Sequence, residues 1–408
     1  MEVATTQKRN FVVSLVAVIM LIAPLSDISR YLAPVHGWWD NGHMIVTSKS
    51  IRLMPDPWKS FLSYYEFYLN ETSVYPDSIY KKLDPEEDFR HYIDLEIWDL
   101  KKPETGTFPY AVELFATDAV NAMRAGDWNK VLYDLGRVSH YVADVHQPYH
   151  STVDYNPRTK TGKALHAVLD AAMEVHYREL NTTTAKDAGP PEPIQNLTSF
   201  CLQIAWQSHS FLKRVNQILI DEGREWSPEL SNIVQNRTNS AIIAVSRVWY
   251  TTALRAAVIP PRIPEPNTFK IDVIGIPKQL DPDKEVALSI VVTDKIGICT
   301  PVSLRATLGN TPLSTYELSY MPDPLGKYSI PLPKETLSRL RGTEASLSLA
   351  AERPGYVSAK FETMIKVEGL SPQFLQTTVA VVAAVIVAAV VLGTAHLRRR
   401  RKQIVIDK

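Results

Sequence analysis

The sequence predicts a multidomain protein with an all-α domain, an all-β sandwich of immunoglobulin or fibronectin type, and one C-terminal transmembrane helix. Three patterns along the 408 residues lead to this prediction. Apolar residues recur at three- and four-residue spacing from residue 38 to about 259. After the proline-rich stretch at 259–269 the spacing changes to two. Residues 374–397 then form an apolar run without a formal charge.

The first 37 residues have the pattern of a secretory signal peptide. Lys8 and Arg9 precede the apolar run 11–25, and Val35 and Gly37 supply the small residues expected before a cleavage site. Cleavage after Gly37 would leave Trp38 as the mature N-terminus.

The helical domain is predicted to span 38–260 and the proline-rich linker 261–268. Helical spacing is clear in five segments, which are 109–128, 129–147, 162–180, 197–219 and 239–258. The sandwich is predicted to span 269–369, with about seven short strands. These strands are 269–276, 285–294, 302–308, 314–320, 327–333, 344–352 and 359–368.

The apolar run 374–397 is long enough to cross a hydrocarbon core of about 30 Å. The basic cluster 398–402 marks its cytoplasmic side and begins the tail 398–408. Together with the signal peptide, this predicts a single-pass type I protein of the cell membrane with its catalytic domain outside the cell.

Charge and cysteine content exclude some classes of function. The chain has 44 basic and 44 acidic residues, and without the cluster 398–402 the balance is 39 to 44. Such a chain has no basic excess with which to capture a polyanion. Two cysteines, Cys201 and Cys299, make neither a disulfide framework nor a cysteine zinc site, and whether they pair is left open.

The spacing of the histidines and aspartates indicates a metal-binding site. His140 and Asp144 stand four residues apart, so both project from one face of a helix, and His166 and Asp170 repeat this spacing. Pro148 ends or bends the first of these helices and lets His150 turn back. Imidazole and carboxylate ligands from neighbouring helices suit zinc.

This pattern resembles the zinc-dependent phospholipase C superfamily, which also contains the single-strand-specific zinc nucleases. The sequence signature of this superfamily is H-x3-D-x5-H followed by H-x3-D/E. An N-terminal Trp and an early His precede this signature, and an Asp and a His lie between the early His and the first motif. The chain supplies Trp38, His43, Asp77, His91, His140, Asp144, His150, His166 and Asp170 in that order. The resemblance covers roughly 38–259 and does not extend to the sandwich or the apolar run.

The resemblance implies three zinc ions per chain. The first would be held by Asp77, His91, His140 and Asp144, the second by His150, His166 and Asp170, and the third by Trp38, His43 and the bridging Asp144. The third set uses the free amine of Trp38, so the signal cleavage would complete the site. Asp77 or Asp170 would orient or deprotonate the attacking water, and the sequence leaves both open as the catalytic carboxylate.

The implied activity is hydrolysis of a phosphodiester. The apolar run, the charge balance and the lack of the glycine-rich GGN segment of the nucleases favour a phospholipid substrate. Asp170, which stands where secreted phospholipases C commonly have Glu, favours the alternative of a single-strand-specific nuclease or 3′-nucleotidase. Nucleic acid is a partner only in that case. A non-catalytic surface adhesion module is a further alternative, and no obligate protein partner is inferred.

Overall fold

The computed structural model describes residues 40–159, 162–182, 188–221, 226–317, 326–369 and 374–388. The predicted signal peptide, Trp38 and the cytoplasmic tail lie outside these residues. The chain divides into two compact units. Residues 1–59, 73–118 and 134–255 form the first, and residues 60–72, 119–133 and 256–408 form the second.

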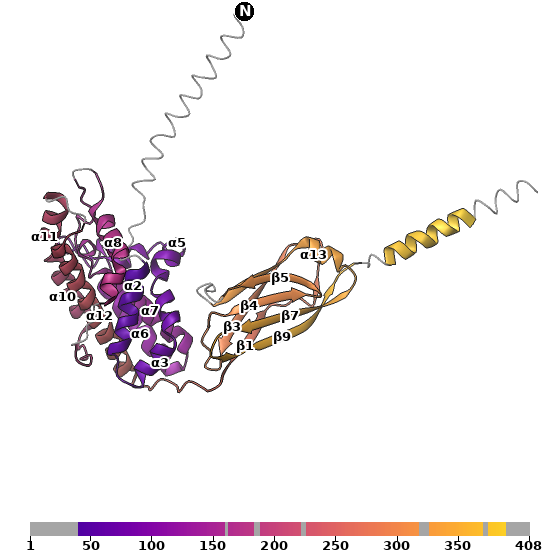
Figure 1. The fold of residues 1–408 in the computed structure, drawn as a ribbon, viewed down its shortest axis with the longest axis horizontal. Coiled ribbons are helices and arrows are strands. Elements are labelled where there is room, and N and C mark those ends of the chain that lie inside the picture. Colours follow the sequence, from indigo (N-terminus) through magenta and orange to yellow (C-terminus); the bar gives the residue numbers. More distant parts are fainter. Residues whose placement is uncertain are drawn as a thin grey trace, which may run out of the picture. The chain divides into compact units, whose positions relative to one another are not determined.

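The part of the chain before residue 257 is helical (Figure 1). Its longer helices are α2 (Asp40–Leu53), α6 (Phe108–Ala125), α7 (Trp128–Asp144), α8 (Leu165–Val175), α10 (Leu197–His209) and α12 (Pro228–Ala256). Its shorter elements are α3 (Trp58–Tyr64), α4 (Glu66–Thr72), η1 (Pro76–Tyr80), α5 (Lys81–Leu83), η2 (Asp88–His91), η3 (Pro103–Thr105), η4 (Pro148–Ser151), α9 (Tyr177–Thr182), α11 (Leu212–Asn216) and η5 (Gln217–Asp221).

Local signals in the sequence determine where α7 begins and where η4 follows it. Gly126 adopts a positive φ of 73°, which ends α6. The side chain of Asp127 then accepts a hydrogen bond from the amide of Lys130 at 3.0 Å, in the manner of a helix N-cap. Beyond α7, Pro148 opens the short helix η4, and Gln147 caps it by accepting from the amide of Tyr149 at 2.6 Å.

Polar contacts hold α2 against α7 and α12. The Thr47 and Ser139 hydroxyls lie 2.7 Å apart and join α2 to α7. The Ser50 hydroxyl donates to the carbonyl of Ile242 at 3.0 Å, which joins α2 to α12. All three side chains are buried, so these bonds fix the register of α2 in the core. This register places the first turn of α2 beside the last turns of α7.

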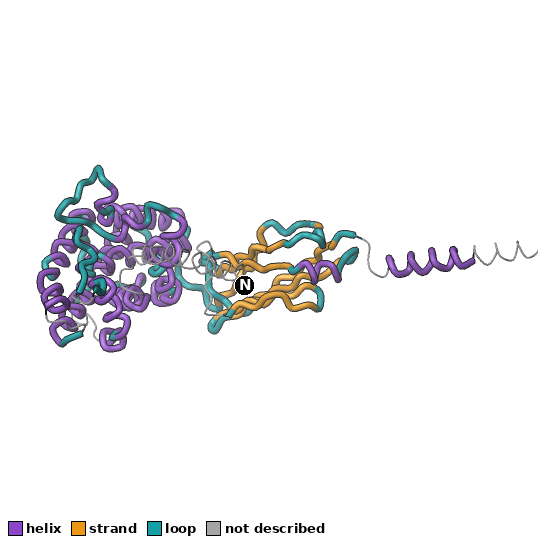
Figure 2. The backbone as a smooth tube through the Cα atoms, turned by 90° about the horizontal axis from the view of Figure 1, so that it is seen from above, coloured by secondary structure: helices purple, strands orange, loops and turns teal. Residues whose placement is uncertain are grey.

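Beyond residue 266 the chain forms two sheets. Figure 2 shows these strands together, with one short helix, α13 (Lys334–Arg339), among them. The strands are β1 (Asn267–Ile274), β2 (Gln279–Leu280), β3 (Val286–Asp294), β4 (Ser303–Leu308), β5 (Thr311–Tyr316), β6 (Lys327–Leu332), β7 (Glu344–Glu352), β8 (Tyr356–Val357) and β9 (Ala359–Val367).

The four-stranded sheet has the order β6-β3-β1-β8, and the five-stranded sheet has the order β2-β9-β7-β4-β5. Alternate residues of both sheets point into one shared core, as Leu304, Leu308 and Leu347 do. A helical domain followed by a β-sheet domain is therefore the observed architecture. The predicted strand 314–320 begins earlier, at Thr311, because Gly309 with its φ of 57° makes a tight turn after β4.

Residues 374–388 are helical with exposed side chains. Within the described part of the chain, no helix has both the length and the apolar content needed to cross a membrane. The predicted transmembrane segment 374–397 is described only to residue 388, and its remainder lies outside the described residues. The transmembrane helix stays a prediction.

Candidate metal centre

Eight of the nine residues predicted as ligands lie in the described chain, and all eight are buried. They come from six elements of the first unit. Helix α2 supplies His43, η1 supplies Asp77, η2 supplies His91, α7 supplies His140 and Asp144, η4 supplies His150, and α8 supplies His166 and Asp170. The ninth, Trp38, lies outside the described residues.

Five of these side chains form one cluster, His43, Asp77, His91, His140 and Asp144. His91 Nδ1 lies 2.8 Å from Asp144 Oδ2 and 3.6 Å from Asp77 Oδ1. His140 Nε2 lies 3.2 Å from Asp144 Oδ2 and 3.9 Å from Asp77 Oδ2. The ring of His43 stacks on that of His140 with 4.0 Å between their centroids.

The two oxygens of Asp144 face different neighbours. Oδ2 faces His91 and His140, whereas Oδ1 lies 3.4 Å from His43 Nε2. A carboxylate placed in this way has one oxygen for each of two metal ions. The arrangement is the one that a bridging ligand requires.

The remaining three ligands form a second group. His166 Nε2 lies 3.0 Å from His150 Nε2 and 3.4 Å from Asp170 Oδ2. The i, i+4 spacing on α8 places His166 and Asp170 on one face, and the turn before η4 brings His150 to it. The turn at Pro148 thus has the effect that the sequence predicted.

Burial and neighbouring charge set the ionisation of these groups. Burial lowers the pKa of His43 to about 3, with His140 adding to the effect. Burial alone would raise the pKa of Asp144, but His140 and His150 outweigh it and hold that pKa well below its ordinary value. Burial raises the pKa of Asp170 well above its ordinary value. Burial alone would lower the pKa of His140, but Asp144 and Asp77 outweigh it and raise that pKa. Burial therefore favours a neutral imidazole at His43 but not at His140, and Asp170 needs positive charge nearby for its carboxylate to ionise.

The donor set and its spacing fit zinc. Two ligand atoms that each lie about 2.1 Å from a tetrahedral zinc are roughly 3.4 Å from each other. The separations between these ligand atoms within the two groups run from 2.8 to 3.9 Å. Both ring nitrogens of His43 and the Oδ1 atom of Asp144 are buried and make no hydrogen bond among the described residues. Buried polar atoms of this kind normally have a partner, and a cation would supply it.

Backbone carbonyls orient two of the histidines. His140 Nδ1 donates to the carbonyl of Ser73 at 2.7 Å, and His150 Nδ1 donates to the carbonyl of His91 at 2.7 Å. Each bond fixes the tautomer whose Nε2 carries the lone pair. That nitrogen is the one that faces the other ligands.

A buried carboxylate, that of Glu87, lies on the far side of His91 from Asp144 and Asp77. His91 Nε2 lies 3.7 Å from Oε1 of the fully buried Glu87. Arg90 and Arg137 hold Glu87 Oε2 at 2.5 and 2.8 Å, and the Tyr141 hydroxyl donates to Oε1. Burial would raise the pKa of Glu87, but His91, Arg137 and Tyr141 outweigh it and lower that pKa to about 2. Glu87 is thus a fixed negative charge behind His91.

Sequence reasoning missed three supporting side chains. Glu87 stands four residues before His91, and Lys81 stands four residues after Asp77, at 2.7 Å from its Oδ1. This i, i+4 spacing was a usable signal. Gln147 donates to Asp170 Oδ1 at 3.0 Å, and no spacing rule pointed to it because the contact crosses from the turn before η4 to α8.

The other described histidines, His146, His176 and His209, lie outside the cluster. His146 Nδ1 donates to the carbonyl of Val142 at 2.7 Å, and His209 Nε2 lies 2.8 Å from Glu96. His176 stacks on Trp226. Cys201 and Cys299, whose pairing was left open, are both buried and form no disulfide.

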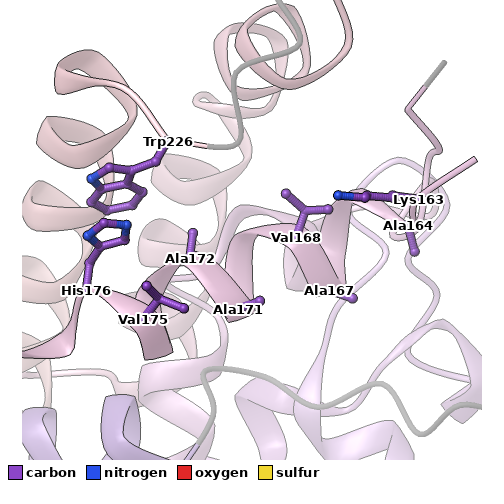
Figure 3. Close-up of a pocket in the computed structure, with 9 residues that line it drawn as sticks. All are labelled: Lys163, Ala164, Ala167, Val168, Ala171, Ala172, Val175, His176 and Trp226. Atoms are coloured by element: carbon purple, nitrogen blue, oxygen red, sulfur yellow. The ribbon is translucent and has the colours of Figure 1, made fainter. Parts of the chain in front are cut away.

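A pocket of about 580 Å³ lies on another face of α8. Figure 3 shows alanine and valine side chains of α8 along it, with His176 against Trp226 at one end. None of the predicted ligands lines this pocket. This pocket is therefore separate from the buried cluster.

Comparison with known proteins agrees with this site. The family model described as zinc dependent phospholipase C matches residues 29–211. Alpha toxin from Clostridium absonum is 13% identical, with a TM-score of 0.41, and the match covers 82% of this chain and 99% of that chain. The alpha-toxin of Clostridium perfringens avian strain SWCP is 12% identical, with a TM-score of 0.39 and the same coverage of 82% and 99%. No curated protein matches the chain. The family model matches a segment that contains every predicted ligand, so residues 29–211 are similar to the zinc-dependent phospholipases C, a family of phosphodiesterases.

Proposed function

We propose that the helical domain hydrolyses the phosphodiester of a phospholipid headgroup outside the cell. The observation that carries the proposal is the buried cluster of His43, Asp77, His91, His140 and Asp144 beside the group His150, His166 and Asp170. We further propose that these residues, with Trp38, hold three zinc ions in the sets given above. The dual orientation of Asp144 supports its role as the bridge.

Zinc bound in these sets would lower the pKa of a coordinated water toward about 7 and stabilise negative charge on the phosphate oxygens. The protein's part is to hold the imidazoles in the correct tautomer and to place a carboxylate beside the water. Asp170 is held by Gln147 through Oδ1, and its Oδ2 faces His166. Asp77 is held by Lys81 through Oδ1, and its Oδ2 faces His43 and His140. Each carboxylate has one oxygen held by a supporting side chain and its other oxygen toward the ligands, and the held oxygen of Asp77 also lies 3.6 Å from His91 Nδ1, so both remain candidates for the catalytic carboxylate.

A lipid substrate is favoured by features outside the cluster. The signal peptide and the apolar run 374–397 would hold the domain near the outer leaflet as a type I protein, where lipid is abundant. Without the basic cluster 398–402 the chain has 39 basic and 44 acidic residues. A polyanion would find no general electrostatic attraction there. The role of the β-sheet domain is open.

The decisive experiment compares substrates on one preparation. The purified full chain is assayed on phosphatidylcholine vesicles and on single-stranded RNA, each with and without chelator. We expect chelator-sensitive release of phosphorylated headgroup from the vesicles and turnover on RNA that is at least tenfold lower. Turnover on RNA far above that on lipid would replace the proposal with the nuclease alternative. Chelator-insensitive turnover, or none on either substrate, would remove the zinc mechanism.

A further inference from the structure

We infer that Lys81 binds the phosphate of the substrate at the edge of the zinc cluster, as a cationic catalytic residue supplied by the protein itself. The inference rests on the proposed phosphodiesterase function and adds a residue that lies outside the nine ligands. It applies to the phosphodiester group, whether this belongs to a lipid headgroup or to a nucleotide.

The first observation is the position of Lys81 behind a ligand. Its Nζ atom lies 2.7 Å from Asp77 Oδ1, while Asp77 Oδ2 lies 3.9 Å from both His43 Nε2 and His140 Nε2. Asp77 therefore stands between the ammonium group and the cluster. A carboxylate whose charge is shared with a metal ion neutralises a neighbouring ammonium less completely, which leaves Lys81 with positive charge to offer to an anion.

The second observation is the reach of this charge. Asp77 Oδ1, the oxygen that Lys81 contacts, also lies 3.6 Å from His91 Nδ1, and Asp77 Oδ2 faces His43 and His140. Only one carboxylate therefore separates the ammonium group from three histidines of the cluster. Phosphate held at the cluster would lie within the field of Lys81.

The third observation concerns access. The ligands on α7 are fully buried, and Asp77, at 7% exposed, is the most exposed of the eight described ligands. The side chain of Lys81 is 9% exposed, and its Nζ lies 3.9 Å from Asp88, whose side chain is 68% exposed. The ammonium group therefore spans the short distance from Asp77 to the solvent. A substrate phosphate entering at Asp77 would meet Lys81 first.

An ammonium group suits this task because it has three donors on a flexible stem. It can keep its bond to Asp77 and donate a second one to a non-bridging phosphate oxygen. Loss of one charge-assisted hydrogen bond of this kind weakens binding by roughly 10- to 100-fold. No covalent change of Lys81 is involved.

The test measures phosphate binding and zinc content on the same protein. The full chain, loaded with zinc, is titrated with inorganic phosphate by calorimetry as wild type, Lys81→Met, Lys81→Gln and Lys81→Arg. Lys82→Met is the matched control, because Lys82 is the exposed neighbour one residue along. We expect Lys81→Met and Lys81→Gln to keep the zinc content of the wild type and to bind phosphate about 10- to 100-fold more weakly. Lys81→Arg should recover part of this loss, and Lys82→Met should match the wild type.

Two results would overturn the inference. Unchanged phosphate affinity in Lys81→Gln, which keeps a donor for Asp77, would show that the charge is not used. Loss of zinc in both neutral variants would show that Lys81 only positions Asp77. The rate of hydrolysis is measured for the same variants on phospholipid vesicles and on single-stranded RNA. A lower rate on the preferred substrate alone, or on both substrates, is consistent with phosphate binding by Lys81. If the wild type binds phosphate through Lys81 and yet hydrolyses neither substrate, the proposed function fails and the phosphate site stands.

Discussion

Replacing Glu87 by Gln removes the one negative charge behind His91 and keeps the shape of the side chain. Glu87 is fully buried and holds Arg90, Arg137 and Tyr141. The guanidinium of Arg137 also lies 3.8 Å from the ring centroid of Phe115, so it cannot turn toward water without losing that contact. The variant would take this carboxylate from Arg137, while Arg90 keeps its ion pair with Asp84 at 2.6 Å, and removal of one side of a buried ion pair is strongly destabilising.

The size of the effect follows from the pKa shift. The pKa of Glu87 falls from 4.5 to about 2, and each unit corresponds to about 1.4 kcal/mol. The charge of Glu87 therefore contributes roughly 3 kcal/mol to the free energy of unfolding at pH 7. Because the pKa is lower in the folded protein, this contribution is fully present above about pH 4.5 and is lost as the pH falls through about 2. At pH 3 roughly half of it should remain.

The assay is urea unfolding of the full chain in chelator, at pH 7 and at pH 3. Glu87→Gln should be less stable than the wild type by roughly 3 kcal/mol at pH 7, and the difference should shrink by about half at pH 3. Glu113→Gln is the control, since Glu113 pairs with Arg255 at 2.7 Å in a half-exposed position. Such pairs contribute about 0–1 kcal/mol. A difference below about 1 kcal/mol for Glu87→Gln, or one that is the same at both pH values, would refute the reasoning.

Two further outcomes test the metal sets. Asp144→Asn should lose two of the expected zinc ions and Asp170→Asn only one, because Asp144 belongs to two of the expected metal sets and faces His43 with one oxygen and His91 with the other. Metal analysis after gel filtration measures this, and full occupancy in Asp144→Asn would contradict the bridge. N-terminal sequencing of the mature protein should begin at Trp38, because the free amine there is the expected ligand; a start at Trp39 or an uncleaved chain would remove the third zinc set.

The structure brings together the residues predicted as ligands, whereas the sequence did not indicate their supporting side chains, and the difference has a physical reason. Metal ligands need particular atoms, so His140 with Asp144 and His166 with Asp170 are visible as i, i+4 pairs of rare residue types. The support of His140 is the carbonyl of Ser73, and a backbone carbonyl leaves no mark in the sequence. Contacts of this kind depend on how the segments pack, which spacing alone does not give.

The same distinction applies to the fold. Alternation predicted the longer strands β3, β4 and β7 closely because one face of each is buried. The two-residue strands β2 and β8 have no period to detect, and both pair in parallel with distant strands. The helical segment predicted at 197–219 breaks after His209, where the Ser210 hydroxyl donates to the carbonyl of Gln207 at 2.6 Å.

The location of substrate choice follows from the burial of the ligands. His140 and Asp144 are fully buried, so side chains behind them cannot touch a substrate and can only tune the metal set. Groups that discriminate between a lipid headgroup and a nucleotide must lie where the cluster meets solvent. Among the described ligands this is Asp77, with Lys81 beside it. If the proposed function holds, we expect the segment from η1 to α5, rather than α7, to decide the preference of this chain among phosphodiesters.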